Sequence, residues 1–332
     1  MSTVPIRVAT FLAILATGGA FAPRAALAFP TFSDWPSRDV KLIVPFPAGS
    51  ADDVAARLYA QGLSRRWTRP VIVENKPGSD AVVVRAAFAN ADDDHTLLYA
   101  TSSMMTAGSL LRRPLRDRTM PDVVPIGSGA STVVVVAVAN HVPARSLKQL
   151  VELVRSKPGE LTWASGPSLP HFSFAATVRR HGLDMMHVPH SEGLTLEPDL
   201  SEGRVHAMCL PLELVTSAVG RGKARILAVT SPHRDVMLPD VPTVAEAGFP
   251  EMEVEDLSGL FGWRRHTPPE LRDRPHVGGN AVADDPIFRE RLVAIGQRVR
   301  AGTPAEFAAA IGRQRIRIQQ IVHIIDLKGA TK

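Results

Sequence analysis

The chain has 332 residues, of which 45% are hydrophobic and 21% are charged, and its formal net charge is +5 at pH 7. These proportions are ordinary for a globular protein and exclude a disordered or fibrous chain. Lys and Arg are scattered among acidic residues rather than clustered in a basic patch, so we expect no nucleic-acid partner.

The first 28 residues follow the order of a secretory signal peptide. A short basic segment ends at Arg7, a run of small apolar residues covers 8–22, and Ala26–Ala28 offers an A-x-A cleavage site. The apolar run is too short to span a bilayer; the alternative is a retained anchor. We therefore expect residues 1–28 to be removed and the rest of the chain to be exported. With Cys209 as its single cysteine, the exported chain has no intrachain disulfide and depends on its core.

Strand and helix patterns alternate along the remaining chain. Strands are predicted at 40–45, 70–74, 96–100, 123–126, 133–138, 162–164, 185–188, 207–210 and 226–230. Helices are predicted at 53–63, 82–91, 146–156, 172–181 and 197–202, and a capping box at 303–306 opens a long final helix. This alternation predicts an α/β fold of two lobes, each a mainly parallel sheet flanked by helices, with a ligand cleft at the C-terminal ends of the strands.

The segment 41–57, with the sequence KLIVPFPAGSADDVAAR, offers a site for an anion. A buried strand is followed by a turn containing Gly49 and by a helix capped near Ser50 or Asp52. Free amides at a helix start, together with the helix dipole, favour a carboxylate, and Gly49 lets the backbone approach a ligand. The alternative is an ordinary strand-turn-helix connection in which Ser50 and Asp53 only cap the helix.

This segment resembles the opening signature of the substrate-binding proteins of tripartite tricarboxylate transporters, also called the Bug family. Later segments are similar to further motifs of that family, in the same order. They are 73–78 (VENKPG), 94–98 (DHTLL), 157–165 (KPGELTWAS), 186–189 (MHVP), 227–248 and 303–307 (TPAEF). The resemblance covers the chain that follows the signal peptide.

The resemblance implies a periplasmic, two-lobed clamshell receptor of type II-like architecture that hands carboxylates to a membrane permease and is not an enzyme. We expect lobe 1 at 36–135 plus 255–332 and lobe 2 at 136–254. The expected partners are a small organic acid and the permease subunits of a tripartite transporter. No cofactor is expected, and a monomer is the default state for such receptors.

The family holds its ligand with backbone amides, hydroxyls and ordered waters, and the matching positions here lie in loops of both lobes. In lobe 1 the predicted ligand contacts are Phe46, Ala48, Gly49, Ser50, Asp53, Thr101, Ser102 and Ser103. In lobe 2 they are Ser165, Gly166, Ser168, His171, His190 and Ser191.

Several positions depart from the family pattern. The turn at 165–171 is shorter than usual and contains Pro167 and Pro170, which lack a backbone N–H and so remove two possible donors. His190 stands where a tyrosine is usual, and the lysine beside it is Glu192 or absent. An added acid near the cleft disfavours an anion. The identity of the ligand is therefore open.

Three alternatives compete with carboxylate transport. His187, His190, His206 and Cys209 have the residue types of a zinc or copper site, which suggests a metal-dependent enzyme. Residues three apart on a strand point to opposite faces, however, so we expect no metal. The sequence has no nucleophile elbow, phosphate loop or zinc-protease motif. The second competitor is a receptor that signals to a two-component sensor kinase, and a weakly binding paralogue is a third.

Overall fold

The computed structural model describes residues 35–77, 88, 93–106, 122–166, 169–190, 196–267, 271 and 280–325. All of them belong to one compact unit, 35–332. The predicted signal peptide, most of the predicted helix at 82–91, and the predicted ligand residues Ser168 and Ser191 lie outside the described residues.

Six strands form the first sheet, in the order β11-β4-β10-β3-β1-β2. They are β1 (Val40–Val44), β2 (Val71–Asn75), β3 (Thr96–Thr101), β4 (Val123–Thr132), β10 (Asp256–Trp263) and β11 (Gln297–Gly302). β1 pairs in parallel with β2 and β3. β10 runs antiparallel to both β3 and β4, and β11 runs antiparallel to β4.

Five strands form the second sheet, in the order β7-β6-β8-β5-β9. They are β5 (Val134–Ala139), β6 (Thr162–Ala164), β7 (Met186–His187), β8 (Ala207–Pro211) and β9 (Ala224–Val229). β6 pairs in parallel with β7 and β8, whereas β5 runs antiparallel to β8 and β9.

Both sheets are therefore mixed, and the expectation of mainly parallel sheets is wrong in this detail. A helix between two strands of one sheet usually makes them parallel, but β5 and β10 each enter their sheet from the other sheet. β4 and β5 are separated only by Val133, so one nearly continuous segment leaves the first sheet and enters the second. β10 makes the return, directly after Glu255. These two crossing segments insert antiparallel strands into the middle of both sheets.

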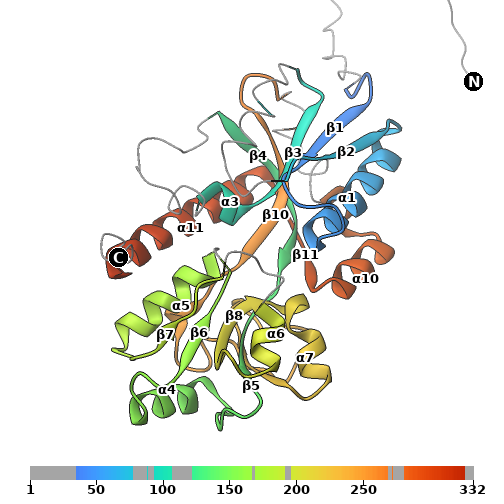
Figure 1. Cartoon of the computed structure of the whole chain (residues 1–332). Coiled ribbons are helices and arrows are strands. Elements are labelled where there is room, and N and C mark those ends of the chain that lie inside the picture. The colour runs from blue at the N-terminus through green and yellow to red at the C-terminus, as the bar shows by residue number, and fades with distance from the viewer. Residues whose placement is uncertain are drawn as a thin grey trace, which may run out of the picture. The chain divides into compact units, whose positions relative to one another are not determined.

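We call the six-stranded sheet with its helices lobe 1 and the five-stranded sheet with its helices lobe 2. The crossings at Val133 and Glu255 fall close to the predicted lobe bounds, which themselves stay a prediction. Figure 1 shows the two groups of strands joined through β4, β5 and β10.

Helices cover both faces of the lobe 1 sheet. Alternate residues of β1 point to opposite faces, so Leu42 packs with Tyr59 on one side and Ile43 packs with Phe307 on the other. The helices on the first side are α1 (Ala51–Trp67), α9 (Asn280–Ala283) and α10 (Pro286–Ala294). On the second side lie α3 (Ser102–Thr106) and α11 (Pro304–Ile325).

The final helix also reaches lobe 2. Ile318 and Ile321 of α11 are buried against Leu169 and Phe172 of α5 (Leu169–Arg180), and Val254 completes this apolar cluster. Figure 1 shows α11 beside α3 and α5. The remaining helices of lobe 2 are α4 (Leu147–Ser156), α6 (Leu196–Ser201) and α7 (Thr216–Gly220), with the short 3-10 turn η2 (Leu212–Leu214).

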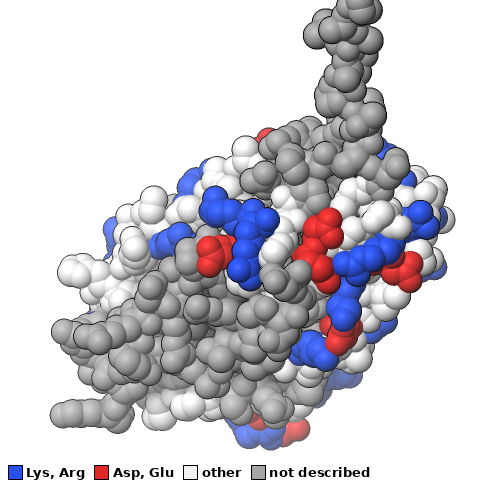
Figure 2. Space-filling model, turned by 90° about the horizontal axis from the view of Figure 1, so that it is seen from above, with Lys and Arg blue, Asp and Glu red and all other residues white. Residues whose placement is uncertain are grey.

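The predicted capping box is confirmed, because Thr303 N donates to Glu306 Oε2 at 2.8 Å and Glu306 N donates to Thr303 Oγ1 at 3.2 Å. Across the described ranges, no helix is both long and apolar enough to cross a membrane. On the face seen in Figure 2, basic and acidic side chains adjoin one another rather than gathering by sign.

Candidate functional site

The loop between β1 and α1 has the geometry of a helix start exposed to solvent. Ser50 is the N-cap of α1, and its Oγ accepts a hydrogen bond from Asp53 N at 3.3 Å. Gly49 has φ +83°, a left-handed conformation that favours glycine. The predicted ligand residues Ala48 and Gly49 are exposed, and Phe46 packs partly against the core.

Asp53 holds this loop in place. Its side chain is buried and accepts from Gly49 N at 2.8 Å, from Arg57 Nε at 3.0 Å and from Asn75 Nδ2 at 2.7 Å. Burial would raise the pKa of Asp53, but the hydrogen bonds from Arg57, Asn75 and Gly49 outweigh it and hold the pKa below its usual value. Asp53 is therefore an ionised anchor of the loop.

These contacts decide which amides remain open to a ligand. The amide of Gly49 is taken by Asp53, and that of Asp53 by Ser50. Within the described ranges, the amides of Ala51 and Asp52 at the start of α1 make no hydrogen bond to the protein. Two donors at a helix N-terminus suit an anion.

The hydroxyls that follow β3 already bind a carboxylate of the chain itself. Ser102 Oγ donates to Asp256 Oδ1 at 3.0 Å, and Ser103 Oγ donates to Asp256 Oδ2 at 2.7 Å. Ser103 N adds a third bond at 2.9 Å, and Thr101 Oγ1 lies 3.0 Å from Ser103 Oγ. Burial raises the pKa of Asp256 against these hydrogen bonds. Asp256 stands at the crossing between the lobes, so the predicted residues Ser102 and Ser103 tie α3 to that crossing.

In lobe 2, Ser165 and His171 lie at the C-terminal end of β6 and the first turn of α5. Ser165 Oγ donates to Cys209 O at 2.6 Å and so joins β6 to β8. The His171 ring packs against Trp163 and His187, with ring centroids 5.2 and 4.8 Å away. Burial lowers the pKa of His171 to about 4 and His187 adds to the effect, so the imidazole is neutral at pH 7. Among the residues that the structure describes, its Nδ1 has no hydrogen-bond partner.

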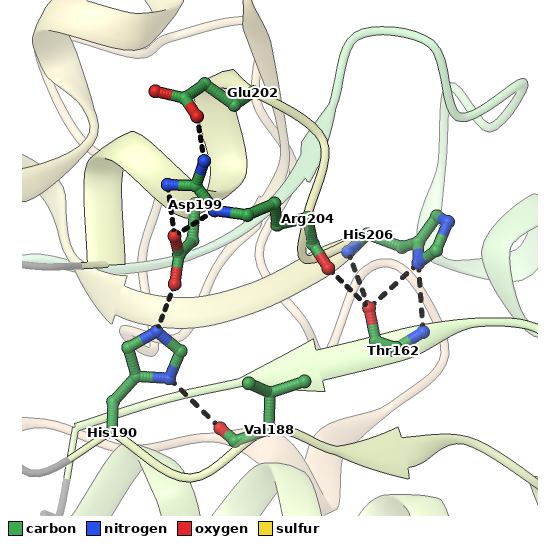
Figure 3. Close-up of polar contacts among 7 residues, drawn as sticks. All are labelled: Thr162, Val188, His190, Asp199, Glu202, Arg204 and His206. Carbon is green, nitrogen blue, oxygen red and sulfur yellow. Dashed lines mark hydrogen bonds and ion pairs between the residues drawn. The ribbon is translucent and has the colours of Figure 1, made fainter.

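His190 belongs to a polar network of lobe 2 (Figure 3). Its Nε2 lies 2.7 Å from Asp199 Oδ2 and its Nδ1 lies 3.0 Å from Val188 O, so both ring nitrogens face oxygen acceptors. Asp199 also pairs with Arg204, whose guanidinium contacts Glu202 as well. The hydrogen bond from His190 is the largest cause that lowers the pKa of Asp199. This network anchors the segment after β7.

The four residues considered as a zinc or copper site do not come together in the structure; they are His187, His190, His206 and Cys209. His206 Nδ1 accepts from Thr162 N at 3.0 Å, and Figure 3 shows it apart from the contacts of His190. Cys209 is fully buried and burial raises the pKa of its thiol to about 12. Across the residues that the structure describes, no three His, Cys, Asp or Glu side chains are placed to hold a metal.

A cavity of about 390 Å³ lies where the lobes meet on the side of α11. Ser102 and Leu257 line it from lobe 1, Leu169 from lobe 2, and Arg313 and Gln314 from α11. Its volume lies in the range of small-molecule sites. Ser102 is the predicted ligand residue that lines it.

Two further acids near the loop had no ligand role in the sequence prediction. Asp52 follows the N-cap of α1 and accepts from Gln297 Nε2 at 2.8 Å; burial and Asp256 raise its pKa to about 7. Glu213 in η2 has a pKa raised to about 8 by burial. Asp52 lies in the segment 41–57 that the sequence singled out, but nothing in the sequence indicates that Glu213 lies near Asp52.

Two α/β lobes joined by crossing strands, with strand-to-helix loops on both, define the class of periplasmic solute-binding proteins. The family model described as "Tripartite tricarboxylate transporter family receptor" matches residues 55–327, and the chain belongs to this family. A UPF0065 protein of Pseudomonas sp. (strain P51) is 30% identical over 293 residues, which cover 87% of this chain and 86% of the relative.

Two solved structures are similar over nearly their full length. R. palustris Rpa4515 with adipate is 26% identical with a TM-score of 0.75, and the match covers 88% of this chain and 99% of that one. MatC from Rhodopseudomonas palustris with bound malate is 26% identical with a TM-score of 0.71, covering 87% and 100%. Both of these similar structures thus hold a small carboxylate, adipate in one and malate in the other.

Proposed function

We propose that this receptor captures a small carboxylate between its lobes, delivers it to a tripartite tricarboxylate transporter permease, and performs no chemistry on it. The observation that carries the proposal is the start of α1, where an exposed loop presents two amide donors next to a helix dipole. The adipate and malate complexes of the two R. palustris proteins support a carboxylate as the ligand.

The protein reaches the periplasm through residues 1–28 as a cleaved signal peptide and acts as a monomer. In the cleft, the amides of Ala51 and Asp52 receive the carboxylate from lobe 1. From lobe 2, the neutral imidazole of His171 offers a hydrogen bond without a charge. The predicted hydroxyls of Ser102 and Ser103 act by fixing α3 to Asp256, because their protons are already donated to that carboxylate.

Calorimetry and thermal shift with a panel of mono-, di- and aromatic carboxylates test the proposal. We expect at least one saturable ligand that raises the melting temperature. A folded protein that binds no member of the panel contradicts it.

Ala51→Pro tests the amide donors directly. Proline is favoured at the first position of a helix and lacks an N–H, and Ser50 already has the extended backbone that precedes proline, with φ −67° and ψ 160°. The variant therefore removes one donor while keeping the helix. A charged hydrogen bond contributes about 1.5–3 kcal/mol, so we expect affinity to fall by about 10-fold or more. Unchanged affinity in a variant of unchanged melting temperature rules the amide out as a ligand contact.

A further inference from the structure

Carboxyl groups from both lobes influence one another electrostatically near the start of the crossing strand β10. Asp52 comes from the first turn of α1 in lobe 1, Glu213 comes from η2 in lobe 2, and Asp256 is the first residue of β10 itself. Asp256 is held by Ser102 and Ser103, as described above. Within the described residues, Asp52 accepts one hydrogen bond from Gln297 Nε2 at 2.8 Å, and neither Asp52 nor Glu213 receives the three bonds that hold Asp256.

A short chain of contacts links Glu213 to Asp52 across the boundary. The lobe 1 turn at Gly296, with φ +73°, lies directly against Glu213: a Cβ placed on Gly296 would be 2.9 Å from Glu213 Oε2 and 3.1 Å from Glu213 N. The next residue, Gln297, is 1% exposed and donates from Nε2 to Asp52 Oδ1 at 2.8 Å. The two lobes are therefore in close contact at this point.

Among the described residues, no basic side chain neutralises these acids. In the described part of the chain, Asp52 and Glu213 form no ion pair with Lys, Arg or His. Arg298, the basic residue nearest in sequence to Gln297, is paired with Asp235. The groups that face Asp52 are Asp256, Gln297, Ser258 and Tyr99, and the titratable group that faces Glu213 is Asp52.

Acids in a partly buried contact without a cation stay protonated to unusually high pH. Burial and Asp256 raise the pKa of Asp52 to about 7, and burial with Asp52 raises the pKa of Glu213 to about 8. Among the residues that the structure describes, the buried atoms Glu213 Oε2 and Gln297 Oε1 have no hydrogen-bond partner. When both acids ionise, two negative charges face each other across the lobe boundary with no cation between them.

We propose that Asp52 and Glu213 form a proton-dependent contact between the lobes: the lobes stay together while these carboxyls are protonated and separate when both ionise. Because Asp52 also belongs to the loop at the start of α1, the contact couples external pH to access to the cleft. The coupling concerns lobe separation itself and holds whatever ligand the cleft takes.

Spin labels on each lobe measure this separation. Arg66→Cys in α1 and Lys148→Cys in α4 introduce labels at exposed positions, while the native Cys209 is fully buried. Pulsed dipolar spectroscopy of the ligand-free protein gives the distance between the labels from about pH 5 to about pH 9. We expect the distances to lengthen as pH rises through about 7 to 8. Circular dichroism at each pH establishes that the fold is intact.

Glu213→Gln keeps the shape of the side chain and removes its charge, so we expect this variant to keep the short distance throughout the range. Asp52→Asn removes the partner charge and is the second variant, used if Glu213→Gln does not fold. Glu152→Gln, at an exposed position of α4, is the matched control and keeps the parent's pH response. Distances that do not change with pH in the parent, or a response that survives both substitutions, overturn the proposal.

Discussion

Asp53→Ala is the sharpest test of how the β1–α1 loop is held. The substitution removes an acceptor of three hydrogen bonds, from Gly49, Arg57 and Asn75, and its site is 2% exposed. The bonds from Gly49 and Asn75 reach a buried carboxylate and contribute about 1.5 kcal/mol each. The Arg57 side chain is 50% exposed, so solvent screening limits its ion pair to about 0.5 kcal/mol. We therefore expect the free energy of unfolding to fall by about 3–4 kcal/mol.

Urea unfolding followed by far-UV circular dichroism measures this loss, with Asp39→Ala as the control because Asp39 is exposed. The control is expected within about 0.5 kcal/mol of the parent. The contribution of Asp53 also has a defined pH dependence. Its folded pKa lies below the unfolded value, so the stabilisation is present above about pH 4 and is lost as pH falls through the lowered pKa. A loss below about 1 kcal/mol in Asp53→Ala refutes the reasoning.

Three further predictions concern other parts of the fold. The thiol of Cys209 is expected to resist Ellman's reagent at pH 8 in the native protein and to react fully in urea, because burial raises its pKa to about 12; rapid native reaction contradicts this. Arg298→Met breaks the ion pair with Asp235, whose side chain is 4% exposed, and is expected to lower the free energy of unfolding in urea by about 3 kcal/mol. Adding Asp235→Leu removes the unpaired charge and is expected to recover part of this loss; a double variant as unstable as Arg298→Met contradicts the prediction. Thr303→Ala removes the N-cap hydrogen bond of α11 and is expected to cost about 1 kcal/mol, measured as a lower urea midpoint at unchanged slope, whereas an unchanged midpoint contradicts it.

Local patterns predicted many elements of the fold. Strands β1 and β3 are short apolar runs next to turn signals, and the capping box at 303–306 marks the start of α11 within a residue. β10 was not predicted as a strand, because Ser258, Gly259 and Gly262 interrupt its apolar pattern. A Cβ at Gly259 would lie 2.3 Å from Gly127 O of β4, and one at Gly262 would lie 2.1 Å from Thr267 Oγ1, so a side chain at either position would clash. Gly259 thus reflects pairing with β4, a strand far away in the sequence, which periodicity does not reveal.

The candidate site shows the same limit. The sequence singled out Gly49, Ser50 and Asp53, and the structure brings them into one loop. It did not show that the Asp53 carboxylate accepts a hydrogen bond from the Gly49 amide. The same carboxylate is also held by Asn75, which lies 22 residues further along the chain and is not part of the motif. Nor did it bring Asp256 to Ser102 and Ser103, since 153 to 154 residues separate them. Hydrogen-bond donors can be counted from a motif, but which of them remain free depends on distant residues.

The order of the strands has a consequence for how the chain matures. All five strands of lobe 2 lie in one continuous stretch, from Val134 to Val229. The two parts of the lobe 1 sheet are instead joined only when β10 is made, because β10 lies between β3 and β4 and pairs with both. A chain emerging from its N-terminus therefore completes its second lobe before its first. Until β10 arrives, β3 and β4 each present an unpaired edge, and this half-built sheet is where a chaperone or an aggregation partner would act.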